Sequence, residues 1–448
     1  MRETAGGARA VARVAATPQP PPGTPEIRPA KRAGQLGRVH ILQLLVVEAL
    51  VVGVLMLLGK DVVVVAVAGA VAALLGVATL ARRDGRWWLE QWAIARVFRR
   101  RQAATPPAGG ADDDLAGLRL LAPGLTVTEL GRSHPELDSQ ETADIGMLTR
   151  DAAESDGPGR AGVIAVARDA AGWYAVAELD TALVTADVPG AGVPLAMLAR
   201  TLAATGQAGV LLQVVTQVTP ALSASPQAGT QANRSYQELI AQVGAGPKPV
   251  NRASWLVVRL EAQLLAVAGA ARDVTDEAPV VVAALLRRAV RTLERAGFAA
   301  TPLDRPGLVA ALHQGCGLEG GPDAPREEWD GWSGGQLTHV TYWISEWPEP
   351  ARVPALVRGF STIPATQTTL ATIVAVPAAD PTEDVPEPPL DEVGLRCLAR
   401  VTAPAPRIGE VHALVMRWAE DGGAQLRRLD GEHAPAVYAT APTGGGRW

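Results

Sequence analysis

Two consecutive apolar runs near the amino terminus constrain the fold of this chain more than any other feature. Residues 39–58 and 62–80 are each close to the ~20 residues that cross the hydrocarbon of a bilayer, and only Gly59, Lys60 and Asp61 separate them. A buried hairpin in a soluble core is the alternative, but two adjacent runs this long are typical of membrane spans. A cleavable signal peptide fits less well, because 38 residues precede the first run and a second run follows at once. The sequence therefore predicts a transmembrane hairpin over residues 38–81.

Charge on either side of the hairpin indicates its orientation. Residues 1–101 carry 15 basic and 6 acidic side chains, although the whole chain has a net charge of −5. Basic flanks stay on the cytoplasmic side because positive charge is hard to translocate. We therefore expect a multi-pass protein of the cytoplasmic membrane with both termini inside. The acidic remainder would repel nucleic acid, and its two distant cysteines agree with a reducing compartment.

Polar and small residues inside the two runs are candidate contacts. Glu48 lies near the middle of the first run, where an ionised carboxylate costs several kcal/mol. It is expected to contact a helix of another subunit or, as a protonated acid, to face the second helix of its own hairpin; a proton pathway is a third interpretation. In the second run Gly69 and Gly76 belong to pairs of small residues four apart, which permit close helix contact.

A tryptophan- and arginine-rich segment follows the second run. In GRWWLEQWAIARVFRRR, residues 85–101, Trp87 shares a helical stripe with Ile94 and Phe98, and Trp88 shares the next one with Trp92. Tryptophan and arginine together favour the headgroup zone of a membrane. The segment is predicted to be an interfacial helix or a stalk that continues the hairpin, and the three tryptophans are candidate membrane or partner contacts. The alternative is an ordinary helix buried in the cytoplasmic core.

Composition divides the rest of the chain. The proline-rich residues 1–37 predict a disordered tail, residues 82–117 a basic stalk and linker, residues 118–442 a cytoplasmic α+β domain, and residues 443–448 a flexible end.

Within that domain the pattern of apolar residues predicts an internal repeat. Two halves read in the same order, β-α-β-β-α-β, which is the ferredoxin-like or split βαβ unit. The fold expected is therefore a duplicated βαββαβ domain. Strands are predicted over 173–179, 210–218, 255–260, 338–345, 370–376 and 395–401, and helices over 194–204, 279–295, 305–314, 353–360 and 408–420.

Signatures of common enzyme classes are missing from the sequence. It has no phosphate-binding G-x-x-x-x-G-K-[ST], no G-x-G-x-x-G, no H-E-x-x-H and no G-x-S-x-G. The acidic run 112–114 lies in a Pro/Gly-rich linker, which makes a metal site a weak interpretation. The segment from Asp430 to His433 could be an acid/base pair, although a structural turn is the simpler interpretation. We therefore predict no catalytic, cofactor-binding or metal-binding residues and no cofactor.

These features together resemble the EccE family of actinobacterial type VII (ESX) secretion machines. The resemblance rests on the two apolar runs, the GRWW and RRR motifs of residues 85–101, SWLVVRLEAQL, Glu328-Trp329 followed by HVTYWISEWP, and LRRLDGEHAPAVYATAPTGGG near the carboxyl terminus. It implies a subunit at the edge of a membrane complex with EccB, EccD and the motor ATPase EccC. It also implies a cytoplasmic domain described as glycosyltransferase-like but inactive.

The function expected from the residues and the resemblance is mechanical. The hairpin would fix the subunit beside partner helices, and the acidic domain would pack on neighbouring subunits, so the protein is predicted not to be an enzyme. Two alternatives remain: a membrane-anchored glycosyltransferase-like enzyme, and a peripheral regulator without a fixed partner.

Overall fold

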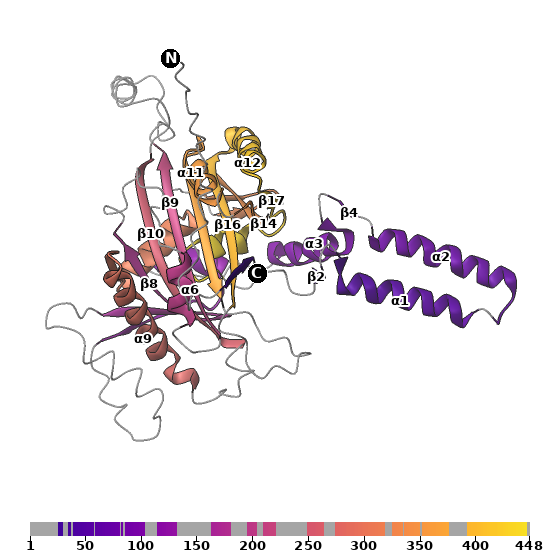
Figure 1. The fold of residues 1–448 in the computed structure, drawn as a ribbon, viewed down its shortest axis with the longest axis horizontal. Helices are drawn as coiled ribbons and strands as arrows, with labels where there is room; N and C mark the ends of the chain where they lie inside the picture. The colour runs from indigo at the N-terminus through magenta and orange to yellow at the C-terminus, as the bar shows by residue number, and fades with distance from the viewer. Residues whose placement is uncertain are drawn as a thin grey trace, which may run out of the picture.

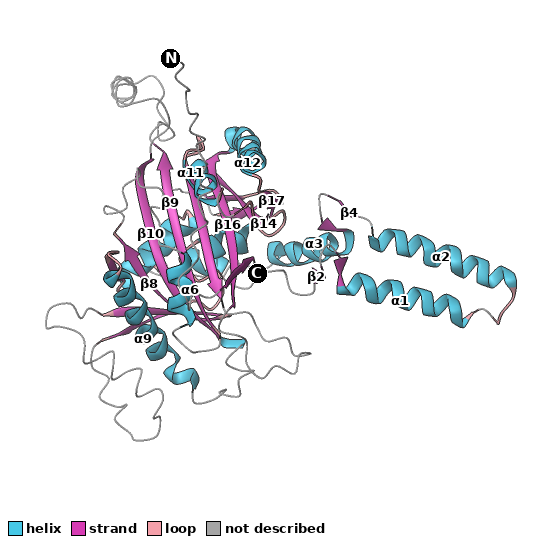
Figure 2. Ribbon diagram, viewed as in Figure 1, coloured by secondary structure: helices cyan, strands magenta, loops and turns pink. Residues whose placement is uncertain are grey.

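The computed structural model describes residues 26–29, 35–36, 39–57, 59–80, 82–83, 86–103, 114–131, 163–180, 195–203, 209–220, 249–263, 274–318, 325–334, 336–349, 352–375 and 392–445. They form a domain built on one large β-sheet and a helical hairpin that projects from it (Figure 1). Helices cover the sheet, whose strands run antiparallel with one exception (Figure 2). The predicted α+β class is therefore confirmed.

The hairpin consists of α1 (Ile41–Met56) and α2 (Val62–Leu80). These helices coincide with the two apolar runs, except that the short strand β3 (Val39–His40) precedes α1 and that α1 ends at Met56. Asp61 starts α2, because its carboxylate accepts a hydrogen bond of 3.0 Å from the N–H of Val63. In the described part of the chain, no helix has both the length and the apolarity that crossing a membrane requires.

Two copies of one strand arrangement make up the centre of the sheet. The first copy has the strand order β11-β8-β10-β9, the second has β15-β16-β14-β17, and antiparallel pairing of β9 with β15 joins them. Numbered within each copy, this is the order 4-1-3-2 and its mirror, as the βαββαβ unit requires. The first copy comprises β8 (Gly172–Leu179), α6 (Leu195–Ala203), β9 (Val210–Pro220), β10 (Pro249–Glu261), α9 (Val274–Arg295) and β11 (Ala300–Pro302). The second comprises β14 (Leu337–Glu346), α11 (Val353–Ser361), β15 (Gln367–Ala375), β16 (Glu392–Pro404), α12 (Ile408–Gly422) and β17 (Gln425–Arg428).

All six strands and five helices predicted from the sequence are present, and the duplication extends beyond them. In each copy the first strand shares one edge between two neighbours: β8 pairs with β7 and β11, and β14 pairs with β13 and β17. A helix and two strands precede each first strand in the same order. They are α4 (Ala116–Leu121), β6 (Thr126–Leu130) and β7 (Ile164–Asp169), and α10 (Arg305–Cys316), β12 (Arg326–Glu327) and β13 (Trp332–Gly334). The strand order thus matches the duplicated βαββαβ unit that the sequence predicted.

Helices pack on both faces of the sheet, because successive side chains of a strand point to opposite faces. On one face, α9 packs on the first copy, α6 lies over the joined strands β9 and β15, and α11 and α12 pack on the second copy. On the other face α4 and α10 pack together with α13 (His433–Thr440), whose side chains are almost all buried. The amphipathic pattern of α9 explains its place, since Val282, Leu286 and Leu293 are buried on one stripe.

Two segments outside the predicted domain differ from the expectation. Residues Glu26–Pro29, assigned from the sequence to the disordered tail, form β1, which pairs in parallel with β16. Residues 443–445, assigned to a flexible end, are buried: the Oγ1 of Thr443 donates to the carbonyl of Tyr438, and the N–H of Gly444 donates to the Oε1 of Gln213. Glycine composition suggested fraying there, whereas these glycines lie against the core at positive φ.

Candidate functional site

The outer surface of the hairpin is apolar. Met56, Val62 and Leu74 are 80%, 81% and 72% exposed, and an apolar groove runs between the two helices, lined in part by Ala49, Gly53, Ala68 and Ala72. Exposed patches of this kind mark surfaces that another apolar phase or protein covers.

Glu48 lies outside that groove, on the exposed side of α1. Leu44, four residues before it, and Val51, three residues after it, are 60% and 52% exposed, so all three side chains share the outward face. Within the described residues Glu48 has no polar partner. The structure therefore does not place it against α2, which was one of the two contacts expected from the sequence.

Gly69 and Gly76 share one face of α2, since they are seven residues apart. Neither lines the groove between the helices, and no other heavy atom lies within 4 Å of the position that a Cβ would take on either residue. Close packing between α1 and α2 thus does not depend on these two glycines.

The tryptophan-rich segment forms β5 (Arg86–Trp87) and α3 (Trp88–Ala103), which we call the stalk helix. Trp88 and Trp92 are 52% and 49% exposed, whereas Trp87 is partly buried. On the stripe predicted for Trp87, Phe98 contacts the ring of Trp329 edge to face, with centroids 5.4 Å apart. One stripe of the stalk helix therefore faces the domain and the other faces away from it.

Arg86, directly before the stalk helix, is inserted into the domain. Its guanidinium donates hydrogen bonds of 3.0 Å to the carbonyls of Asp430 and Arg428 and forms an ion pair of 3.1 Å with Glu432. The Arg86 side chain is only 5% exposed. A buried arginine of this kind is stable only when its donors are satisfied, as they are here.

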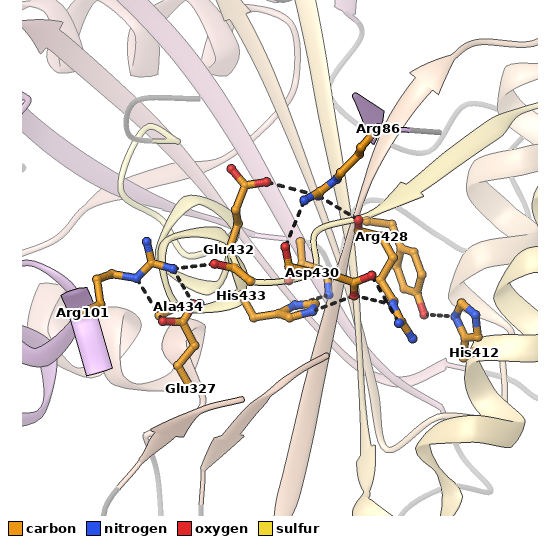
Figure 3. Close-up of polar contacts among 12 residues, drawn as sticks. Arg86, Arg101, Glu327, His412, Arg428, Asp430, Glu432, His433 and Ala434 are labelled. Carbon is orange, nitrogen blue, oxygen red and sulfur yellow. Dashed lines mark hydrogen bonds and ion pairs between the residues drawn. The ribbon is translucent and has the colours of Figure 1, made fainter. Parts of the chain in front are cut away.

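Arg101, near the other end of the stalk helix, binds Glu327. Its Nε and Nη2 donate to the two carboxylate oxygens at 3.0 and 2.9 Å, and Nη2 also donates to the carbonyl of Gly431. The same carboxylate accepts the N–H of Ala434 at 3.0 Å, and the side chain of Gln102 donates to the carbonyl of Glu327. Figure 3 shows Arg86 and Arg101 pointing toward the same segment, 428–434. We call these contacts, between residues 86–102 on one side and residues 327–329 and 427–434 on the other, the junction.

Gly431 is required by the junction geometry. Its φ is +71°, and a Cβ added there would lie 2.5 Å from the Cζ3 atom of Trp329. Only glycine meets both conditions without strain.

Asp430 and His433, which the sequence offered as an acid/base pair, contact other residues of the domain. Asp430 accepts from the Nε of Arg428 at 2.5 Å, and its Oδ1 lies 3.7 Å from the Nε2 of the fully buried His433, whose Nδ1 accepts from the N–H of Thr341. Burial alone would raise the pKa of Asp430, but its interactions with His433 and Arg428 outweigh burial and hold that pKa below the usual value. Asp430 is thus kept as a carboxylate that orders the turn.

A second polar network, not anticipated from the sequence, lies beneath α13. The buried Arg259 binds both carboxylate oxygens of Asp169 and donates to the carbonyl of Thr443 at 2.6 Å. Tyr438 donates to Asp169 at 2.9 Å and meets the hydroxyl of Tyr174 at 3.1 Å. An arginine at an inward position of an apolar strand was the signal that could have predicted this network.

Arg400 lies on β16, the strand of the second copy that corresponds to β10, which carries Arg259. Among the described residues, no carboxylate pairs with Arg400. It donates to the carbonyls of Val437 and Gly315, and burial lowers its pKa to about 10. Nearby His339 is fully buried and hydrogen-bonded to Thr402 at 2.8 Å. Burial and then the charge of Arg400 lower the pKa of His339 to about 3. Arg400 thus holds the carboxyl-terminal helix α13 on the sheet.

Metal binding has no geometric support in the described chain, where no three His, Cys, Asp or Glu side chains cluster. Asp114 forms an ion pair with Arg305 at 3.0 Å, and the other two aspartates of the acidic run lie outside the described residues.

Comparison with known proteins identifies one segment. Residues 248–344 match the family model described as "Putative type VII ESX secretion system translocon, EccE". This segment runs from β10 through most of β14 and includes Glu327 and Trp329 of the junction. No curated protein matches the chain. The resemblance to the EccE family is therefore confirmed over residues 248–344.

Proposed function

We propose that this protein is a non-catalytic subunit of the type VII secretion membrane complex, which the hairpin anchors and the domain links to neighbouring subunits. The observation that carries the proposal is an apolar hairpin joined to a folded domain through arginines at both ends of the stalk helix. With two attachment points, a force on the hairpin reaches the domain without bending the connection. EccB, EccD and the motor ATPase EccC are the partners that the resemblance implies.

The exposed side chains of α1 and α2 support insertion into the cytoplasmic membrane. Burying surface of this kind is favourable by about 25 cal/mol per Å² of apolar area. In this arrangement the turn at Lys60 reaches the outer face, and both termini lie in the cytoplasm. The predicted division into hairpin, stalk and domain remains part of this proposal.

The outward position of Glu48 supports a contact with a helix of another subunit. A carboxylate facing lipid is costly, and a donor on a partner helix would remove that cost. Gly69 and Gly76, on the surface of α2, would let a second helix approach closely.

A non-catalytic, mechanical role is also supported by the contacts of the polar residues in the segment 430–433. Asp430, Glu432 and His433 all contact other groups of the chain, and His433 is fully buried. These contacts lie within the junction.

Affinity isolation of the full chain from native membranes in mild detergent tests the proposal. We expect EccB, EccC and EccD to co-purify with this chain in a large complex, and we expect these partners to be lost when Glu48→Leu is introduced. Glu410→Leu, which changes an exposed glutamate on α12, is the matched control and should leave the complex intact. A monodisperse monomer would favour the regulator, and saturable, metal-dependent binding of a nucleotide sugar would favour the enzyme; either result refutes the proposal.

A further inference from the structure

The stalk helix divides its charged residues between its two faces. Glu90 and Arg101 face the domain, where Glu90 lies 3.7 Å from Arg427 and Arg101 binds Glu327. The opposite face carries three exposed arginines and two exposed tryptophans, and its residues are Trp88, Trp92, Arg96, Arg99 and Arg100. We call this the outward face. It presents cations and no acid, because the acid of the helix is turned inward.

The tryptophans of the outward face are exposed beside these cations. Trp88 and Trp92 are about half exposed, and the guanidinium carbon of Arg96 lies 5.5 Å from the centre of the Trp92 ring. Within the described residues none of the three arginines has a carboxylate partner. Indole and guanidinium groups together suit an interface that is apolar on one side and anionic on the other.

The position of the outward face relative to the hairpin fits a membrane surface. The stalk helix lies between the hairpin and the domain (Figure 1). With a rise of about 1.5 Å per residue, Trp92 lies about 6 Å and Arg100 about 18 Å from Trp88 along the helix. A headgroup layer is about 5 to 8 Å thick, and charges act over about 8 Å beyond it at physiological ionic strength. The tryptophans would thus lie among the headgroups and Arg96 within their field, and the long side chains of Arg99 and Arg100 would extend back toward it.

We propose that the outward face of the stalk helix binds the anionic phospholipid headgroups of the cytoplasmic leaflet. This inference rests on the proposed insertion of the hairpin and adds a lipid preference to it. Each arginine contributes about fivefold to the affinity for an anionic surface. Bound headgroups would fix the depth of the stalk helix, and through the junction they would fix the distance of the domain from the membrane.

A single fluorescent label on the outward face tests the inference. The native cysteines Cys316 and Cys397 are fully buried, so Ala95→Cys offers one reactive thiol on this face. The labelled full chain is placed in nanodiscs of phosphatidylcholine alone or with phosphatidylglycerol, and quenching by neutral acrylamide is measured. We expect at least twofold weaker quenching in the anionic discs and loss of that difference at high salt.

Two triple variants provide the comparison. Arg96→Gln/Arg99→Gln/Arg100→Gln should abolish the difference between the discs. Arg358→Gln/Arg407→Gln/Arg417→Gln removes the same number of exposed charges from the region of α11 and α12 and should preserve it. Equal quenching in both discs, or a difference that survives the first triple variant, would overturn the inference.

Two further outcomes distinguish failure of the lipid inference from failure of the proposed membrane anchor. Protection that appears in native membranes but in neither disc would overturn the lipid inference in favour of an acidic protein partner. A chain that does not enter the discs at all would refute the membrane anchor itself, and this inference with it.

Discussion

Arg101 holds Glu327 by two hydrogen bonds of 3.0 and 2.9 Å, although 226 positions separate these residues in the chain. The carboxylate is almost completely buried, while the Arg101 side chain is 32% exposed. This pair and Arg86 fix both ends of the stalk helix. Loss of either contact should therefore free one end of the stalk helix while the fold of the domain is retained.

Arg101→Gln should lower the free energy of unfolding by about 1 to 3 kcal/mol, because it leaves a buried carboxylate with fewer donors. Thermal or denaturant unfolding of the full chain in detergent measures the change. Arg100→Gln, on the outward face, should change stability by less than about 0.5 kcal/mol. A double-mutant cycle with Glu327→Gln should give a coupling of about 0.5 to 3 kcal/mol, and additive effects would contradict the contact.

Gly431→Ala should destabilise the protein by about 1 to 3 kcal/mol, since it forces a Cβ against Trp329 at a φ of +71°. Gly409→Ala is the matched control, because Gly409 lies in α12 and nothing is within 4 Å of its added Cβ. That control should be stabilising by about 0.5 to 1 kcal/mol. Equal effects of the two substitutions would show that the turn tolerates a side chain.

Acidification should destabilise the domain through His339. Burial lowers its folded pKa to about 3, whereas the unfolded chain protonates it near pH 6.5, so the unfolded state binds the extra proton between these values. Above pH 6.5 this group does not lower the free energy of unfolding. Between pH 6 and pH 4 it lowers the free energy of unfolding by about 1.4 kcal/mol per pH unit. His339→Asn should make the measured slope shallower by about one proton. The slopes of the two proteins should coincide between pH 7 and 8, and unchanged slopes at acidic pH would refute the assignment.

Ending the chain after Ala441 should cost more than about 3 kcal/mol. It removes the carbonyl of Thr443 that accepts from the buried Arg259 and the N–H of Gly444 that donates to Gln213. A chain that ends after Gly445 keeps both contacts and is the comparator. Similar unfolding midpoints for the two chains would contradict a structural role of residues 442–445.

Cys316 and Cys397 should resist thiol reagents in the folded protein. Both are fully buried, and burial raises the pKa of each thiol to about 12, so little thiolate forms near neutral pH. Labelling followed by mass spectrometry should find modification of both residues only after denaturant is added. Rapid reaction under native conditions would show that the domain opens.

Sequence patterns predicted the central fold well, because the apolar run of β8 is buried on both faces of the sheet and the apolar stripe of α9 is buried against it. The same reasoning missed β7 and β13, which extend the repeat at the shared edges of β8 and β14. The three residues of β13 are too few for a period to be recognised, whereas β7 has six residues and was missed although residues 164–167 are apolar.

The junction could not be predicted from local sequence. An arginine after an apolar run indicates membrane orientation whether or not it also binds a distant carboxylate, so Arg86 and Arg101 were interpreted only by their charge. The buried end was missed for a related reason. Composition does not distinguish the glycine of a frayed end from Gly444, whose φ of +82° lets the backbone approach Arg259 closely.

Because Arg101 and Glu327 are far apart in the sequence, the ribosome synthesises Arg101 well before its partner. At 5 to 20 residues per second, a ribosome needs about 10 to 45 s to travel the 226 positions between them. The 344 positions from Arg86 to Asp430 take longer still. During that interval the nascent stalk helix has no binding surface for its inward face, so a chaperone or a neighbouring subunit could occupy it before the domain closes around its own amino-terminal segment.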